Sequence, residues 1–434
     1  MSWTKALWSL LAPAVAILFA MLVVSIALLI VDINPLDTFK AMWDFGRTST
    51  SVASTVNRAV PLYISAVAVA IGFQMGLFNI GVEGQYLMGA LFGAWVGGNI
   101  ALWAPLHVTV VILVAILVGA LWAGIAGALK VTRGVHEVIS TIMLNFISFS
   151  LIAYLLLNFF RDSPERLNLQ TAGLPASGQF PGLNWVFDVL GFSEPKGIEM
   201  HGFVFVALLI GIFYYVLVWR TRFGYELRAT GMNAEAARMS GINPKRMVLG
   251  AMLISGGVAG MVALGTMMGS LHAYSQDFPR GLGFTGIAVA LLGRNNPVGM
   301  AAGALLFGFM ERSALILDLQ DTPKEVVTIM QGVVVLAVVI AYEVVNRIIE
   351  RREVSAASDE TMGMELEGVR IMPMVKGIPE GAVSNPDGEF EFSVALQGDA
   401  RSFPVRFQRE GYREQRYQVS ESDWTVDGRL AFKV

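Results

Sequence analysis

The chain has 434 residues, of which 55% are hydrophobic and only 15% charged, and its mean hydropathy is +0.59. This composition is far from that of a soluble globular protein and indicates a polytopic membrane protein embedded in a lipid bilayer. The absence of cysteine excludes disulfides, thiolate nucleophiles and cysteine-ligated metals. With a formal net charge of only −3, no nucleic-acid partner is expected.

Apolar segments of about 20 residues, the length that crosses a bilayer as a helix, recur along most of the chain. They lie at 8–31, 58–78, 82–99, 107–129, 135–159, 202–219, 247–269, 282–292, 298–317 and 326–346. The first is longer than the core of a signal peptide and lacks a small-x-small cleavage site, so we expect it to be retained. The segments predict an all-α polytopic membrane protein with about ten transmembrane helices.

The distribution of basic residues predicts the orientation of these helices. With the N-terminus in the cytoplasm, the inside segments hold 13 Lys and Arg residues, whereas the outside segments hold 8 in roughly twice the length. Because basic residues concentrate in cytoplasmic loops, both termini are predicted to be cytoplasmic.

Two glycine-rich regions interrupt the apolar segments, at 72–84 and at 281–297. Non-helical backbone inside a membrane persists only where it is buried in protein or lines a wet cavity, so broken helices here suggest a path. Glu83 in the first region is either a pathway residue or a structural carboxylate that accepts bonds from freed backbone amides. Asn145, in the middle of an apolar segment, either faces the path or makes an interhelical hydrogen bond.

Glycines also recur at four-residue intervals on several predicted helices. Gly89, Gly93 and Gly97 form one such series, and Gly256 and Gly260 form another. This spacing allows helix backbones to approach closely, within one subunit or between two.

A polar segment, 220–248, separates two apolar segments and carries six basic side chains. Asn233 is a suitable N-cap, and Gly241 can adopt the left-handed conformation that ends a helix. The pattern predicts a helix of about two turns over 234–240, about 10–12 Å long. This helix has no face broad enough to build a core, so we expect it to fit into a groove of another protein.

The composition changes after residue 354, since residues 355–434 carry 9 basic and 14 acidic residues. Strict alternation at 389–394 and at 430–434, with a turn signal at 385–388, predicts strands. We therefore predict three parts: a transmembrane permease domain (1–350), a linker (351–361) and a small cytoplasmic β-sandwich-like, all-β domain (362–434).

The sequence contains no recognisable motif for catalysis, nucleotide binding or metal binding. The Gly-x-Gly-x-x-Gly spacing at 281–286 follows no predicted strand and therefore predicts helix breaking rather than dinucleotide binding. No phosphate-binding Gly-x-x-x-x-Gly-Lys-Ser/Thr motif occurs, and the four histidines have no ligand spacing. No catalytic residue, no metal site and no cofactor are expected on this chain.

Four phrases together resemble a known family. They are FNIGVEGQ (78–85), HEVISTIMLN (136–145), RATGMNAEAARMSGI (228–242) and GFTGIAVALLGRNNP (283–297). Over residues 1 to about 350 the chain resembles the permease subunits of bacterial ABC importers of the sugar and branched-chain amino acid type, and most closely the nucleoside permeases. The C-terminal region departs from that family, whose permeases usually stop soon after the last span.

The resemblance implies a bacterial cytoplasmic (inner) membrane location and several partners: a second permease, often different from the first, two cytoplasmic ATPases that hold ATP and Mg, and an extracytoplasmic substrate-binding protein. It also implies that the short helix is the coupling helix that docks on an ATPase. The candidate ATPase-coupling residues are Arg228, Gly231, Asn233, Glu235, Ala236, Ala237 and Gly241. The candidate translocation-path residues are Asn79, Glu83, Gln85, Thr141 and Asn145.

The expected function is therefore that of a membrane-spanning subunit of an ATP-driven importer, with nucleosides as the expected substrates. A permease for simple sugars is the nearest alternative. A stand-alone channel or ion-coupled carrier is a third, but it requires paired ionisable residues in the membrane, and few are available.

Overall fold

The structure is a computed structural model that describes residues 18–19, 21–26, 28–30, 32–163, 168–318, 326–338 and 340, together with the backbone of short strands between 383 and 432. By internal contacts the chain divides into two units, Met1–Tyr342 and Glu343–Val434. Each unit is described by itself.

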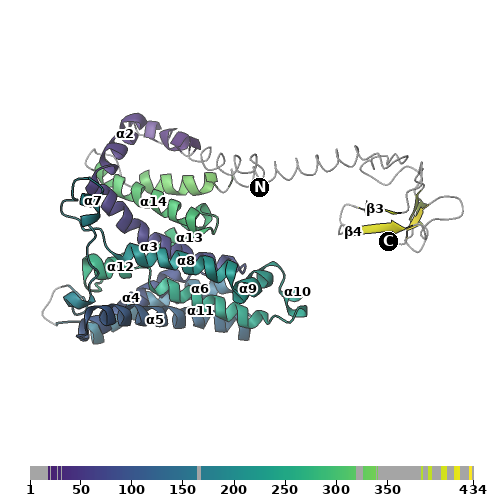
Figure 1. Cartoon of the computed structure of the whole chain (residues 1–434), viewed down its shortest axis with the longest axis horizontal. Helices are drawn as coiled ribbons and strands as arrows, with labels where there is room; N and C mark the ends of the chain where they lie inside the picture. Colours follow the sequence, from purple (N-terminus) through teal and green to yellow (C-terminus); the bar gives the residue numbers. More distant parts are fainter. Residues whose placement is uncertain are drawn as a thin grey trace. The chain divides into compact units, whose positions relative to one another are not determined.

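The first unit is built from helices (Figure 1). They are α2 (Pro35–Gly46), α3 (Ser49–Phe73), α4 (Val82–Asn99), α5 (Ala104–Arg133), α6 (Glu137–Leu155), α7 (Trp185–Val189), α8 (Phe203–Arg220), α9 (Arg222–Met232), α10 (Ala234–Met239), α11 (Pro244–Gly260), α12 (Leu264–Thr266), α13 (Leu282–Leu292) and α14 (Pro297–Asp318). π-Helical turns extend α6 through Leu156–Phe160 and α12 through Met267–Leu271, and a 3₁₀ turn spans Ala176–Gly178. A further apolar helix spans Val326–Val338.

The predicted count of ten membrane-spanning helices is wrong. Among the described residues, six helices are long and apolar enough to cross a membrane, or seven if the bent pair Met21–Ile30 and Pro35–Gly46 is one span. The six are Ser49–Phe73, Ala104–Arg133, Glu137–Phe160, Phe203–Arg220, Pro244–Leu271 and Pro297–Leu317.

Two of the predicted segments, 8–31 and 326–346, lie partly outside the described residues. For the two helices next to the glycine-rich breaks the difference has a physical reason. α4 begins with polar side chains and is rich in glycine, and its residues from Val82 to Leu91 are buried in protein, so it does not need an apolar surface. The eleven residues of α13 extend about 16 Å, roughly half the hydrocarbon thickness of a bilayer. A segment can therefore be apolar without forming a complete span.

The prediction of a small C-terminal all-β domain is also wrong, because the described part of this region shows no such domain. It contains only short strands in two separate antiparallel sheets, ordered β1-β2-β5 and β3-β4. The strands are β1 (Val383–Ser384), β2 (Phe390–Phe392), β3 (Ser402–Phe407), β4 (Gln415–Ser420) and β5 (Leu430–Phe432). The predicted linker, 351–361, lies outside the described residues, and the domain boundary at residue 350 stays a prediction.

The glycine series allow the close helix packing that was predicted, and they do so within this chain. A Cβ on Gly89 of α4 would lie 2.9 Å from the Cα of Gly260 on α11 and 3.0 Å from the carbonyl oxygen of Ala115 on α5. Gly256 of α11 similarly packs against Gly119 of α5. α4, α5 and α11 therefore form one closely packed group that supports the start of α4.

Candidate functional site

The break between α3 and α4 is held together by the side chain of Asn79, which is buried. Its Oδ1 accepts hydrogen bonds from the backbone N–H of Gly81 at 3.1 Å and from Nε2 of Gln85 at 2.9 Å. Its Nδ2 donates to Oε1 of Gln85 at 2.9 Å and to the hydroxyl of Ser255 on α11 at 2.8 Å. The Ser255 hydroxyl donates in turn to the carbonyl oxygen of Ala68 on α3 at 2.6 Å. Asn79 and Gln85 therefore join three helices.

Glu83 lies in the first turn of α4 and is only 2% exposed. Its Oε1 accepts hydrogen bonds from the backbone N–H of Gly281 at 2.6 Å and from the hydroxyl of Tyr86 at 2.9 Å. Its Oε2 accepts from the backbone N–H of Gly283 at 2.8 Å. The carboxylate thus satisfies free amide groups at the start of α13, where the helix dipole also favours negative charge. Glu83 connects the two breaks that the sequence indicated.

Gly283 allows this connection through its lack of a side chain. A Cβ there would lie 2.6 Å from the backbone nitrogen of Glu83. One turn further along α13, Gly286 packs against Ser65 of α3, whose hydroxyl donates to the carbonyl oxygen of Leu282 at 2.9 Å. The start of α13 is therefore held between α3 and α4.

Asn145 on α6 contacts the same break from another side. Its Oδ1 accepts a hydrogen bond from the backbone N–H of Gly84 at 2.9 Å, and its Nδ2 donates to the carbonyl oxygen of Ile80 at 3.0 Å. Thr141, one turn earlier, is also buried, but its hydroxyl donates within α6 to the carbonyl oxygen of Glu137 at 2.7 Å. Asn145 therefore stabilises non-helical backbone, whereas Thr141 packs beside it.

The structure brings all five predicted path residues together at the start of α4, and each of them is buried. We name Asn79, Glu83, Gln85, Thr141 and Asn145 the α4 polar cluster. Tyr86 and Ser255 belong to its hydrogen-bond network and were not predicted. Tyr86 follows Glu83 by three residues on one helical face, a spacing that the sequence does show, whereas Ser255 comes from a distant helix and gives no sequence signal. The assignment of the cluster to a path stays a prediction.

We expect Asn145→Ala to destabilise the permease by about 2–6 kcal/mol. The change leaves the amide of Gly84 and the carbonyl of Ile80 without their partner, and each unpaired buried group costs about 1–3 kcal/mol. Asn158→Ala is the matched control, because the side chain of Asn158 is exposed and bonds only to its own helix. Thermal unfolding in detergent measures both variants, and equal midpoints would contradict the expected role of Asn145.

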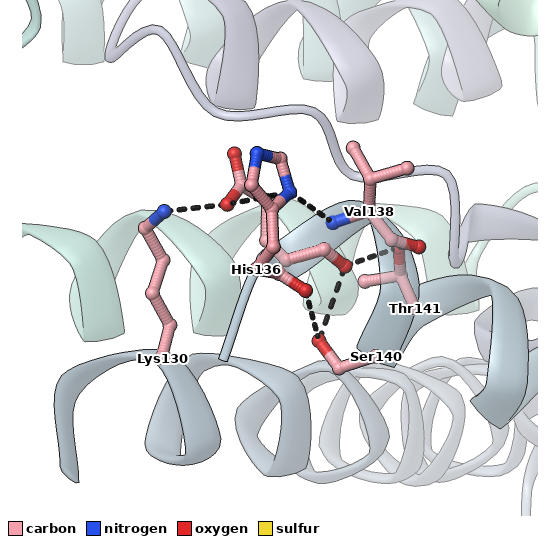
Figure 2. A network of polar contacts seen from close by, with 6 residues as sticks. Lys130, His136, Val138, Ser140 and Thr141 are labelled. Carbon is pink, nitrogen blue, oxygen red and sulfur yellow. Dashed lines mark hydrogen bonds and ion pairs between the residues drawn. The ribbon is translucent and has the colours of Figure 1, made fainter. Parts of the chain in front are cut away.

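A second polar network lies at the start of α6, one turn before Thr141 and two turns before Asn145 (Figure 2). The Nδ1 of His136 accepts a hydrogen bond from the backbone N–H of Val138 at 3.3 Å and thereby caps the helix. The carboxylate of Glu137 forms an ion pair with Lys130 in the last turn of α5. These contacts fix α5 and α6 to each other at this end and so fix the position from which Thr141 and Asn145 project.

The short helix predicted within 220–248 is confirmed as α10. The Oδ1 of Asn233 accepts hydrogen bonds from the backbone N–H groups of Glu235 and Ala236, both at 3.0 Å. Gly241 has a φ of +83°, and the next residue, Ile242, returns a hydrogen bond to the carbonyl oxygen of Ala237 at 3.0 Å. Both ends of α10 therefore have the caps that the sequence predicted.

α10 lies at one end of the helical unit and exposes most of its surface (Figure 1). Ala237 is buried at 4% exposure, whereas Glu235 and Ala236 are exposed. Met232 and Met239, at its two ends, are 88% and 86% exposed. α10 therefore contacts its own chain through Ala237 and directs most of its other side chains outward.

Arg228 and Gly231, the remaining predicted coupling residues, contact their own chain. The guanidinium carbon of Arg228 lies 4.3 Å from the ring centroid of Trp219 on α8. Gly231, near the end of α9, lies against the backbone of Gln74 and Met75. Both residues therefore connect α9, the helix before α10, to other parts of the same chain.

Comparison with known proteins identifies the family. The profile described as branched-chain amino acid transport system / permease component matches residues 51–339. The chain belongs to this family. As a family member it is a multi-pass membrane protein and a permease subunit of an ABC transporter, so the family predicted from the four phrases is confirmed. Among its described residues, no group of three or more metal-ligating side chains is present.

Three relatives resemble this permease over most of its length. The guanosine ABC transporter permease protein NupP of Bacillus subtilis is 33% identical over 344 residues, which cover 78% of this chain and 96% of NupP. The glucose ABC transporter permease protein TsgB13 of Haloferax volcanii is 33% identical over 75% of this chain and 85% of its own. The nucleoside ABC transporter permease protein NupB of Lactococcus lactis is 27% identical over 81% of this chain and 96% of its own.

Proposed function

We propose that this permease forms the translocation path of an ATP-driven importer for nucleosides and that ATP is hydrolysed on partner subunits. The observation that carries the proposal is α10, an exposed helix with both ends capped, in a chain without a phosphate-binding motif. Energy from ATP has to enter this chain through a contact with another protein, and α10 has the form of such a contact.

The proposed docking surface consists of Asn233, Glu235, Ala236 and Gly241. Asn233 and Gly241 fix the ends of α10, while Glu235 and Ala236 face outward, ready to enter a groove on the ATPase. Ala237 anchors α10 to its own chain, and Arg228 supports it through Trp219. ATP and Mg are held by the ATPases, and this chain needs no cofactor.

The α4 polar cluster is the proposed centre of the path. It joins two broken helices, the form in which membrane transporters place substrate sites, and its residues come from α4, α6 and the break before α4. In the structure their hydrogen bonds are made to protein groups, so we propose that the path opens beside the cluster when the helices that it joins move.

The proposed partners are two cytoplasmic ATPases, a second permease of different sequence and an extracytoplasmic substrate-binding protein. The proposed location is the bacterial cytoplasmic (inner) membrane, with the N-terminus and α10 on the cytoplasmic side. The basic residues of the 220–248 segment support this orientation. Co-purification of the four kinds of subunit from detergent-solubilised membranes measures the composition directly.

Nucleosides are the preferred substrates because NupP and NupB carry guanosine and nucleoside in their names and match nearly their full lengths. A simple sugar is the second candidate, because the glucose permease TsgB13 is equally identical to this chain. Competition against uptake of labelled guanosine by the complete transporter separates the two. Excess unlabelled nucleosides are expected to abolish uptake and excess glucose to leave it unchanged. Uptake of labelled glucose that nucleosides do not inhibit would favour the sugar.

A further inference from the structure

Gly231, near the end of α9, lies against the backbone of the turn after α3. A Cβ at this position would lie 2.7 Å from the carbonyl oxygen of Gln74, 2.8 Å from the Cα of Met75 and 2.9 Å from its carbonyl carbon. All three atoms belong to the backbone, which has no flexible end that could move aside. The end of α9 therefore rests directly on the turn after α3.

This turn, 74–77, is itself rigid. Gly76 has a φ of +70°, and the backbone N–H groups of Met75 and Leu77 both donate to the carbonyl oxygen of Gly72, at 2.9 and 3.0 Å. The side chains of Met75 and Leu77 are buried in one apolar cluster with Leu227 of α9. The turn and α9 are therefore joined by a backbone contact and by an apolar contact.

The same turn connects to both breaks in the membrane. Asn79, the first member of the α4 polar cluster, follows Leu77 by two residues. On the other side, Nε2 of Gln74 donates to the hydroxyl of Tyr214 on α8 at 3.1 Å, and this hydroxyl donates to the carbonyl oxygen of Asn295 at 2.7 Å. Asn295 lies in the turn between α13 and α14. The 74–77 turn therefore contacts α9 on one side and is connected to α4 and to the end of α13 on the other.

We propose that Gly231 is a positioning residue that transmits the displacement of α10 to the 74–77 turn and through it to the α4 polar cluster. Its lack of a side chain lets the two backbones approach, and although the residue is exposed, the proposed role is carried by this contact within the chain and not by a contact with the ATPase. The inference rests on the proposed function, since it takes α10 as the point at which the ATPases act. It identifies the residues that connect α10 to the proposed translocation path.

The first test is Gly231→Ala in the complete transporter, with Gly332→Ala as the matched control. A Cβ on Gly332 meets no atom within 4 Å, so the control adds the same methyl group without a clash. We expect the Gly231→Ala permease to bind the ATPases and to hydrolyse ATP normally, but to transport about tenfold less substrate per ATP. The control is expected to match the wild type.

Two outcomes of this test would overturn the proposal. Unchanged transport per ATP would show that the contact transmits nothing. Loss of the ATPases from purified Gly231→Ala permease, with the helical unit intact, would show that Gly231 faces the ATPase. In contrast, wild-type uptake that does not depend on the ATPases would contradict the proposed function itself, so the two failures are distinguishable.

The second test does not depend on the folding of Gly231→Ala. Because the chain has no cysteine, the thiol introduced by Met75→Cys can be labelled selectively with a maleimide. Met75 is 6% exposed, so labelling reports movement at the turn. We expect the labelling rate to change at least about tenfold between the ATP-bound and ATP-free complex, and Leu62→Cys in the buried part of α3 to show no change. Equal rates for Met75→Cys in both states would overturn the proposal.

Discussion

Glu83→Ala is expected to lower the free energy of unfolding of the permease by about 2–6 kcal/mol and to abolish uptake. The substitution removes the acceptor of the buried amide of Gly283 and of the partly buried amide of Gly281, and each unpaired group costs about 1–3 kcal/mol. Tyr86 loses one partner but keeps the carbonyl oxygen of Pro279 at 2.9 Å. The loss is a large fraction of a typical stability of about 5–15 kcal/mol. Thermal unfolding and uptake are measured on the same preparation.

Glu83→Gln and Glu235→Ala complete the series. The glutamine keeps one acceptor oxygen for one of the two amides, so its loss of stability is expected to be smaller than that of the alanine variant. Glu235 is exposed on α10, and its removal is expected to leave the unfolding midpoint unchanged. If Glu83→Ala unfolds at the wild-type temperature and loses only uptake, the carboxylate acts as a pathway residue and its structural role is contradicted.

Ala236→Asp is expected to separate the permease from its ATPases while the membrane helices remain folded. Ala236 is exposed in the first turn of α10, where a negative charge favours the helix itself. In the proposed docking the introduced carboxylate is buried in the groove of the ATPase, and burying an unpaired carboxylate costs several kcal/mol. A cost of about 3 kcal/mol lowers affinity on the order of 100-fold. Co-purification of the ATPases and ATP-driven uptake both measure the loss.

Ala236→Ser is the control for Ala236→Asp, since it adds one hydroxyl without charge at the same position. It is expected to retain most of the association and of the uptake. Ala236→Asp permease that still binds the ATPases with wild-type affinity would contradict the assignment of α10 as the docking helix. Loss of the folded permease in Ala236→Asp would contradict the view that this surface is free within the chain.

The structure of the segment 220–248 could be predicted closely from the sequence because its signals are local. Asn233, Gly241 and the Asn243-Pro244 pair each fix backbone conformation within a few residues, and the structure has a cap or a helix start at each of them. The local pattern does not show against which part of the chain α9 packs. The contact of Gly231 with Gln74 and Met75 joins residues more than 150 positions apart and could be found only in the structure.

The candidate site shows the same limit. The glycine-rich breaks and the polar residues in them indicated where to look, and the five predicted residues do lie together. Their backbone partners were not predictable, because finding the amides that donate to Glu83, or the backbone groups that bond to Asn145, requires knowledge of which helix starts lie nearby. In the structure Glu83 accepts bonds from amides at the start of α13 and Asn145 bonds to the backbone around the start of α4, and the assignment of either residue to a path stays a prediction.

Both errors in the fold arise because a local sequence pattern was taken to determine tertiary structure. Apolar length alone was counted as a membrane span, although α13 is too short to cross and α4 is buried by its neighbours. In the C-terminal region, alternation of side chains predicted strands, and short strands such as Phe390–Phe392 are present. Alternation determines local extension only, so it does not show that strands assemble into a domain.

ATP-dependent uptake by the reconstituted transporter is the measurement that shows whether this permease works in an ATP-driven importer. The permease, its partner subunits and the binding protein are placed in vesicles, and labelled guanosine is supplied with ATP or with ADP. Labelled guanosine is expected to accumulate against a gradient with ATP and not to accumulate with ADP or when the ATPase subunits are left out. Accumulation that continues without ATP hydrolysis would contradict this expectation and favour a stand-alone carrier.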